Sequence, residues 1–113
     1  MDQGRFQEAQ KAYEAGDFRS AAKGFLASAG KGAEGNGAAY HMAGNALMRL
    51  RRYRDATTVY GHALRDPAYD RRGAVQANLG QAYAALGEYP EAVAAFDAAL
   101  AEPDYTTRWR ALQ

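Results

Sequence analysis

The sequence lacks cysteine and has little proline, tryptophan or net charge. Its 113 residues include three prolines and one tryptophan, and the formal net charge is +1. Without cysteine, a disulfide, thiol catalysis and a thiolate metal site are excluded. This composition fits a reducing compartment, and we expect a cytoplasmic protein. A charge so close to zero argues against a dedicated nucleic-acid or anionic-membrane binder.

Long apolar runs are also missing. No run approaches the roughly 20 residues that a membrane-spanning helix needs, so we expect no membrane association. The polar start of the chain, residues 1–6, has no apolar core of the kind found in a signal peptide. The length suits one small domain. Arginine outnumbers lysine by 11 to 3 and alanine is abundant, which we interpret as bacterial coding bias rather than as a functional signal.

The sequence does contain a pattern of aromatic and small residues that occurs three times. Four positions keep one register, with steps of 35 and then 36 residues: the aromatics Phe18, Tyr53 and Tyr89, the alanines Ala21, Ala56 and Ala92, the aromatics Phe25, Tyr60 and Phe96, and the small residues Ser28, Ala63 and Ala99. Four independent positions in one register indicate an internal repeat.

The third copy carries a family pattern. It reads Leu79-Gly80-x-x-Tyr83, then Gly87-Glu88-Tyr89-x-x-Ala92-x-x-x-Phe96-x-x-Ala99, then Pro103. This pattern resembles the tetratricopeptide repeat, a helix–turn–helix unit of about 34 residues. The second copy keeps most of it, whereas the first lacks the leading large residue and the closing proline.

The resemblance implies an all-α fold, a right-handed α-solenoid of antiparallel helix–turn–helix repeats. We expect a single tetratricopeptide repeat domain over residues 1–113, with repeats at about 2–35, 37–70 and 73–106 and a partial helix at 105–113. The helices are predicted at 3–15, 18–29, 38–50, 53–65, 71–86 and 89–101. Tyr60 and Phe96 should be buried between helices.

Glycine and acidic residues mark the predicted turns. Gly16 and Gly87 can take the left-handed conformation that ends a helix. Arg51 stands where the other two repeats have these glycines, which predicts a strained, left-handed arginine. Asp17 and Asp70 are the expected N-caps of the helices that follow them, because a carboxylate can accept from amides of the first turn.

Neither the glycine-rich connector nor the histidines indicate a catalytic or cofactor site. The connector 30–37 follows no predicted strand and has no Gly-Lys-Ser/Thr element, so it does not match a phosphate loop. His41 and His62 have no second histidine or cysteine at ligand spacing, which argues against zinc. The scattered hydroxyls support no nucleophile–base arrangement. We therefore expect no cofactor, no metal and no enzymatic activity.

One face of each first helix has no evident packing role. Its residues follow i, i+4, i+7 spacing and so share one side of the helix, and stacking of repeats brings the three sides together. By the resemblance, this is the concave face on which the family usually binds peptides. Amides there can pair with a peptide backbone, and basic side chains can attract a carboxylate. The expected peptide-binding residues are Phe6, Gln10, Tyr13, His41, Asn45, Met48, Arg49, Asn78 and Gln81.

A narrower hypothesis is a carboxylate clamp. Family members that hold the C-terminal carboxylate of chaperone tails use basic and asparagine side chains on successive first helices. His41, Asn45 and Asn78 match three of those places, with histidine instead of lysine, and Arg108 or Arg110 is near a fourth. We favour the simpler interpretation that the asparagines are ordinary residues of the family.

The alternative to peptide binding is a structural role. Trp109 lies in an unfinished last helix, and a terminal repeat normally presents a polar outer face. The repeat ends could therefore associate and use the Trp109 end to dimerise or to extend the array.

Overall fold

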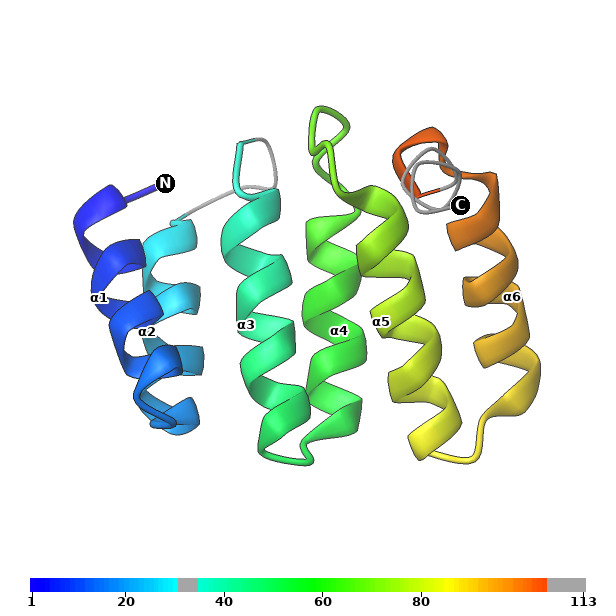
Figure 1. Ribbon diagram of the computed structural model, residues 1–113, viewed down its shortest axis with the longest axis horizontal. Helices are drawn as coiled ribbons and strands as arrows, with labels where there is room; N and C mark the ends of the chain where they lie inside the picture. Colours follow the sequence, from blue (N-terminus) through cyan, green and yellow to red (C-terminus); the bar gives the residue numbers. More distant parts are fainter. Residues whose placement is uncertain (31–34, 106–113) are drawn as a thin grey trace.

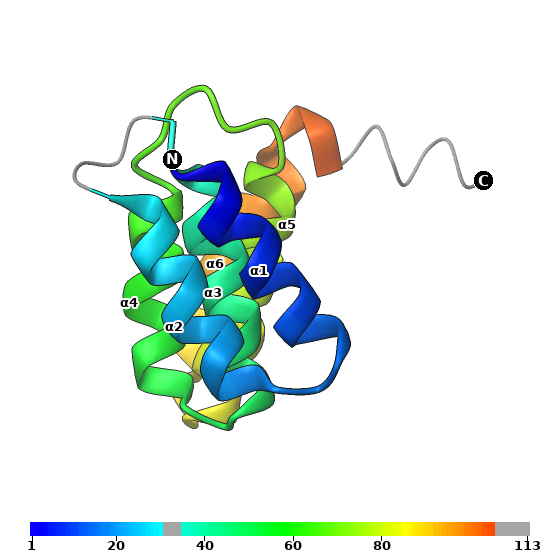
Figure 2. The ribbon, with the colours of Figure 1, turned by 90° about the vertical axis from the view of Figure 1, so that its left-hand side faces the viewer.

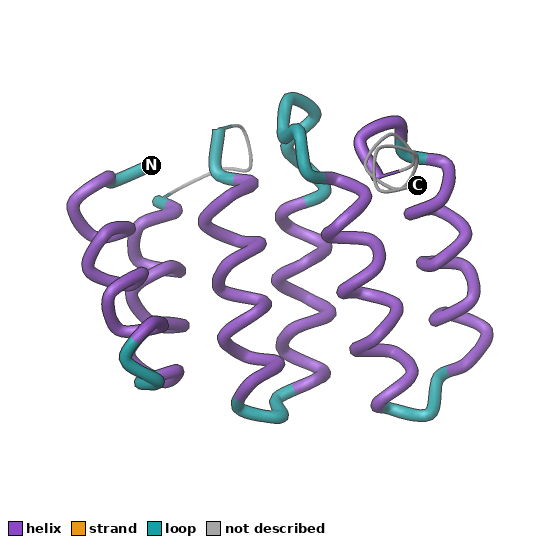
Figure 3. The backbone as a smooth tube through the Cα atoms, viewed as in Figure 1, coloured by secondary structure: helices purple, strands orange, loops and turns teal. Residues whose placement is uncertain are grey.

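Six helices account for most of the described chain, and their ends lie within two residues of the predicted ones. The computed structural model describes residues 1–30 and 35–105. Within these ranges the helices are α1 (Gln3–Glu14), α2 (Phe18–Ala29), α3 (Gly37–Arg49), α4 (Tyr53–Ala63), α5 (Arg72–Ala85) and α6 (Tyr89–Ala101), as shown in Figure 1. Their connections alternate between the two ends of the molecule, so consecutive helices run antiparallel (Figure 3). Most of the predicted partial helix at 105–113 lies outside the described residues.

The turns inside the three helix pairs share one hydrogen-bonding pattern, although one of them lacks glycine. Gly16 and Gly87 have φ angles of 82° and 76°, and Arg51 adopts 59° as predicted. The amide of the next residue donates to a carbonyl five residues back, which closes a Schellman motif. These bonds, each 2.9 Å long, join Asp17 to Ala12, Arg52 to Leu47 and Glu88 to Tyr83.

In the helix pairs α3–α4 and α5–α6, an aromatic ring of the later helix covers a glycine of the earlier helix. A Cβ on Gly44 would overlap the ring of Tyr60, and a Cβ on Gly80 would lie 2.7 Å from Cε1 of Phe96. The two helices can approach this closely because glycine has no side chain. The repeat register places both pairs of residues at equivalent positions.

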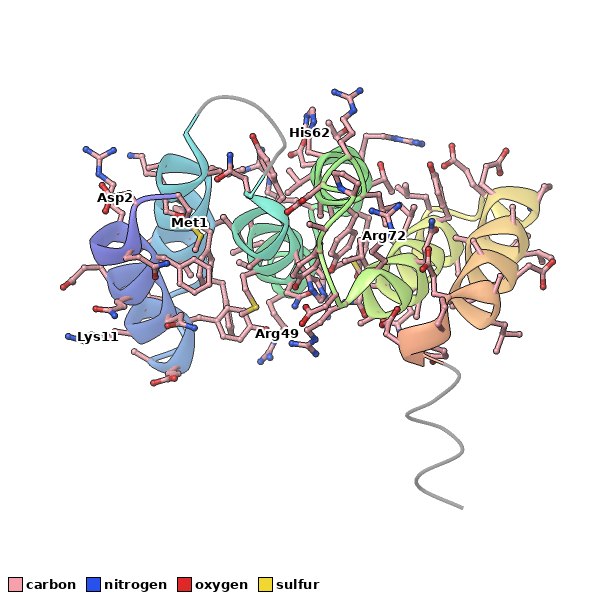
Figure 4. The ribbon with its side chains drawn as sticks, turned by 90° about the horizontal axis from the view of Figure 1, so that it is seen from above. Met1, Asp2, Lys11, Arg49, His62 and Arg72 are labelled. Carbon is pink, nitrogen blue, oxygen red and sulfur yellow. The ribbon has the colours of Figure 1, made fainter. Side chains whose placement is uncertain are left out.

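Successive helix pairs stack side by side and form a solenoid. α2 packs against α3 and α4 against α5, while α3 also contacts α5. Seen from above, α1, α3 and α5 form one side and α2, α4 and α6 the other (Figure 4). The view from the end places α1 and α2 in front of the later pairs (Figure 2). We call the side formed by α1, α3 and α5 the first-helix face.

Two linkers are hydrogen-bonded to the start of an earlier helix. The amide of Gly37, at the start of α3, donates to Oδ2 of Asp66 at 3.0 Å. The amide of Gly73, near the start of α5, lies 3.3 Å from both carboxylate oxygens of Asp104. A carboxylate at this place satisfies an amide that has no partner within the helix and is favoured by the helix dipole. The two glycines are equivalent in the repeat register, and the two interactions span 29 and 31 residues of sequence.

Two predictions about these elements are wrong. Asp70 does not cap α5, whose N-cap is Arg71 without a side-chain hydrogen bond, because the carboxylate of Asp104 occupies that helix start. Phe96 is 38% exposed, whereas Tyr60 is fully buried as predicted. The reason is that α4 packs between α3 and α5, while α5 is the main described neighbour of α6.

Candidate functional site

A chain of polar side chains joins α3, α4 and α5 at the centre of the first-helix face. The Tyr60 hydroxyl donates to Oδ1 of Asn45 at 2.6 Å, and Nδ2 of Asn78 donates to the same oxygen at 3.1 Å. Nδ2 of Asn78 also lies 3.1 Å from Nε2 of His41, whose Nδ1 lies 2.7 Å from the Tyr69 hydroxyl. We call these five residues the central network.

Burial decides the protonation state of the histidine in this network. His41 is only 2% exposed. Burial, assisted by the nearby positive charge of Arg71, lowers the pKa of His41 from 6.5 to about 4, so the ring is neutral at pH 7. Because the Asn78 amide is a donor, Nε2 acts as the acceptor, and we infer that Nδ1 carries the proton and donates to Tyr69.

The hydroxyl at the other end of the network is also held in one state. Burial, with a smaller contribution from Tyr13, raises the pKa of Tyr60 well above its ordinary value. The hydroxyl therefore stays protonated and donates to Asn45. The hydrogen bonds of this neutral network fix both asparagine side chains.

The expectation that His41 lies open on the face is wrong. Both ring nitrogens are engaged and the ring is neutral, so it cannot provide a cation for a ligand carboxylate. The carboxylate-clamp hypothesis therefore loses its first basic residue. Arg108 and Arg110, its remaining basic candidates, lie outside the described residues.

A second group of predicted residues packs aromatic rings between α1, α2 and α3. Phe6 contacts Phe25 edge to face, with 5.2 Å between ring centroids. Tyr13 contacts Phe18 in the same way at 5.1 Å. The guanidinium carbon of Arg49 lies 4.4 Å from the centroid of the Phe18 ring, within the range of a cation–π contact. Phe6 and Tyr13 thus help to join the two helices of the first repeat, and Arg49 joins the second repeat to the first, roles that the sequence did not indicate.

Several polar groups nevertheless remain open on the first-helix face. Gln10, Arg49 and Gln81 are exposed, and Met48 is partly exposed. Asn45 keeps its Nδ2 donor, whose single contact among the described residues is a long one of 3.9 Å to a methionine sulfur. The Oδ1 acceptor of Asn78 accepts no hydrogen bond from the described part of the chain. Figure 4 shows Arg49 pointing away from the side formed by α2, α4 and α6.

Sequence reasoning missed two members of the central network, Tyr60 and Tyr69. Tyr60 was predicted as a core aromatic, and its periodic position gives no sign that its hydroxyl reaches Asn45. Tyr69 lies in the linker between α4 and α5 and covers Gly37, with 2.6 Å between its Cγ and an ideal Cβ on that glycine. The recurrence of tyrosine in the next linker, at Tyr105, is the one available signal, and it does not identify a partner.

A separate groove lies on the other side of the array. It has a volume of about 550 Å³ between α2 and α4 and contains none of the predicted peptide-binding residues. Its lining includes the apolar residues Leu26, Leu50 and Val59 and the basic residues Arg19 and Lys23.

A tetratricopeptide repeat family model matches residues 73–102 of the sequence, and the helix pairs before this region repeat its architecture. These findings support a repeat protein of the tetratricopeptide type. Such repeats are generally protein–protein interaction modules, and the family typically provides non-enzymatic scaffolds. No curated protein matches the sequence.

None of the helices in the described ranges is long and apolar enough to cross a membrane. Within residues 1–30 and 35–105, no group of three or more histidine or acidic side chains is arranged to hold a metal ion.

Proposed function

We propose that this tetratricopeptide repeat protein binds an extended segment of a partner protein across the first-helix face and acts as a scaffold rather than as an enzyme. The repeats would span about 2–35, 37–70 and 73–106 within one domain, with stacking as in other arrays. The proposal includes a cytoplasmic location, which would allow the cysteine-free chain to meet its partner in a reducing compartment.

The observation that carries the proposal is the pair of open polar groups held by the central network. Nδ2 of Asn45 is a donor and Oδ1 of Asn78 is an acceptor, and the two side chains are hydrogen-bonded to each other across α3 and α5. An extended peptide presents N–H and C=O groups that need such partners. Groups already fixed before binding lose little conformational entropy when the ligand arrives, which favours affinity.

The surrounding residues suit a mixed peptide rather than a wholly charged one. Gln10 and Gln81 add exposed amides at the two sides of the network, and Met48 offers apolar contact. Arg49 is exposed and favours an acidic side chain or a carboxylate in the ligand. Phe6 and Tyr13 contribute the parts of their rings that remain accessible.

The first experiment selects ligands from a library of random peptides and titrates the best one against variants. Gln81→Ala should weaken binding about fivefold if its amide pairs with the peptide, since one hydrogen bond contributes about 1 kcal/mol. Gln76→Ala is the matched control, because Gln76 lies on the same helix but lines a hollow between α5 and α6. Equal effects of the two changes would contradict the proposed location.

A second variant separates binding from support of the fold. Asn45→Ala removes the acceptor of the buried Tyr60 hydroxyl and should destabilise the protein by about 1–3 kcal/mol. Asn45→Asp keeps that acceptor but removes the Nδ2 donor. We expect it to change stability by less than about 1 kcal/mol and to weaken peptide binding about fivefold. If Asn45→Asp binds like the wild type, the asparagine serves only to brace the helices.

Self-association through the C-terminal end is the second candidate function. Trp109, on which this hypothesis first depended, lies outside the described residues. A different feature of that end, the exposed side of α6, supports an association that does not depend on Trp109.

A further inference from the structure

The outer side of α6 carries a continuous apolar stripe. Tyr89, Val93, Phe96 and Leu100 are 65%, 58%, 38% and 63% exposed. Their spacing of four, three and four residues places them on one side of the helix, in the pattern of a coiled-coil seam. We call these four residues the α6 stripe.

The repeat register shows what kind of surface the α6 stripe is. The positions equivalent to Val93 are Ala22 in α2 and Thr57 in α4, which are only 5% and 8% exposed. Those equivalent to Phe96 are Phe25 and Tyr60, both fully buried. α3 packs on α2, and α5 packs on α4. The α6 stripe is therefore the side of a repeat on which another helix normally packs, and large exposed apolar areas of this kind mark interaction sites.

The two ends of the array differ in polarity, which limits how copies can meet. The lining of the hollow on α1 and α2, the pair at the opposite end (Figure 2), includes the charged residues Asp2, Arg5 and Glu8 beside small residues such as Ala9 and Ala12. The Arg5 and Asp2 side chains pair there at 3.5 Å. Head-to-tail stacking would place the apolar stripe against these charges and desolvate them. Contact between the α6 stripes of two copies leaves these charges in water.

We propose that two copies of this chain associate through their α6 stripes, with the two α6 helices antiparallel about a twofold axis. This interaction goes beyond peptide binding on the first-helix face and does not depend on it. The stripe is self-complementary, because Tyr89 would face Leu100 of the second copy and Val93 would face its Phe96. A twofold contact closes on itself and gives a dimer rather than a filament.

The mass in solution is the first test. In light scattering over a range of concentrations, the mass should rise with concentration toward twice the 12.2 kDa of the chain. Val93→Glu should raise the dissociation constant at least tenfold and leave the dilute monomer folded, because Val93 is exposed there. Ala94→Glu is the matched control, since it adds the same charge one residue away, on an exposed position outside the stripe, and it should retain the dimer.

The pairing of opposite ends of the stripe provides the second test. Tyr89→Glu and Leu100→Lys should each weaken the homodimer at least tenfold. An equimolar mixture of the two proteins should form a heterodimer, because the introduced charges are opposite and the other Tyr89–Leu100 contact is intact. A parallel pairing would bring identical positions together, so the two introduced charges would not meet and recovery would be limited to the loss of like-charge repulsion.

Three results would overturn the proposal. The first is a mass of 12.2 kDa at every concentration. The second is a large loss of thermal stability in dilute solution, in which Val93→Glu lowers the melting temperature as much as a core substitution does. Such a loss would mean that the chain covers its own stripe. The third is a dimer that Val93→Glu and Ala94→Glu weaken equally, which would place the contact elsewhere.

Discussion

His41 is the buried residue through which pH should act on this fold. Its pKa is 6.5 in an ordinary setting and about 4 in the folded protein. The unfolded chain thus binds more protons than the folded one between these values. Stability is full above pH 6.5 and falls as the pH drops through 6.5 toward 4. We expect urea denaturation to give a free energy of unfolding about 2 kcal/mol lower at pH 5 than at pH 7.

Two glutamine variants assign this pH dependence to its source. His41→Gln should largely remove it, although the variant should also be less stable because the bond to Tyr69 is lost. His62→Gln should retain it, since His62 is partly exposed and lies outside the central network. A wild-type free energy that stays level between pH 7 and pH 5 would show that His41 is not held neutral by burial.

Arg51 holds a backbone conformation that ordinarily favours glycine. Its φ of 59° costs a side-chain-bearing residue about 1 kcal/mol. Arg51→Gly removes that strain but gives the unfolded chain more freedom, so we expect the free energy of unfolding to stay level or rise by up to about 1 kcal/mol. Arg54→Gly is the control and should destabilise the protein by about 1 kcal/mol, because Arg54 lies within α4, where glycine is unfavourable. A clear drop in melting temperature for Arg51→Gly would mean that the arginine makes a stabilising contact.

The helix pairs α3–α4 and α5–α6 should tolerate the same change very differently. Gly44→Ala would force a methyl group into Tyr60, which is fully buried and hydrogen-bonded, and should cost about 1–3 kcal/mol. Gly80→Ala meets Phe96, which is 38% exposed and can turn outward. Alanine also favours a helix over glycine by about 1 kcal/mol, so this variant should be nearly neutral. Chemical denaturation of both variants measures the difference, and equal losses would contradict the unequal covering of the two rings.

The elements themselves were predicted well, and the reason lies in local chemistry. Helix ends depend on residues close in sequence, such as Gly16 and Gly87 in the Schellman turns, and the register of 35 and 36 residues placed Arg51 in the same role. Asp70 was assigned wrongly because the carboxylate that serves α5 comes from Asp104, 31 residues after Gly73. A contact across that distance leaves no trace in local spacing.

The sequence predicted which face of the helices carries the candidate site, but not which residues on that face are open. Helical spacing placed the residues on α1, α3 and α5, but it could not separate those that remain open from those that pack. Gln10 and Gln81 are exposed, whereas His41 is buried because Tyr69 and Asn78 reach it from other elements. Which polar atoms pair depends on how the helices stack, and the stacking is known only from the structure.

The whole array should be most protected at its centre. α3 and α4 each pack against a helix on both sides, and α3 buries seven residues whereas α6 buries three. Local opening is easiest where few buried contacts must be broken. Hydrogen exchange in dilute solution should therefore be slowest in α3 and α4 and faster in α1 and α6. Uniform protection along all the described helices would show instead that the protein opens only as one unit.

The hydrogen bond between Gly37 and Asp66 also affects the order in which the repeat can form during synthesis. The carboxylate is made 29 residues after the amide that it satisfies. At about 5–20 residues per second, a ribosome needs a few seconds to supply it. During this interval the start of α3 depends on water, and the same delay recurs between Gly73 and Asp104. The second and third repeats are therefore each completed by the segment that follows them, so that their assembly during synthesis lags behind the making of their helices.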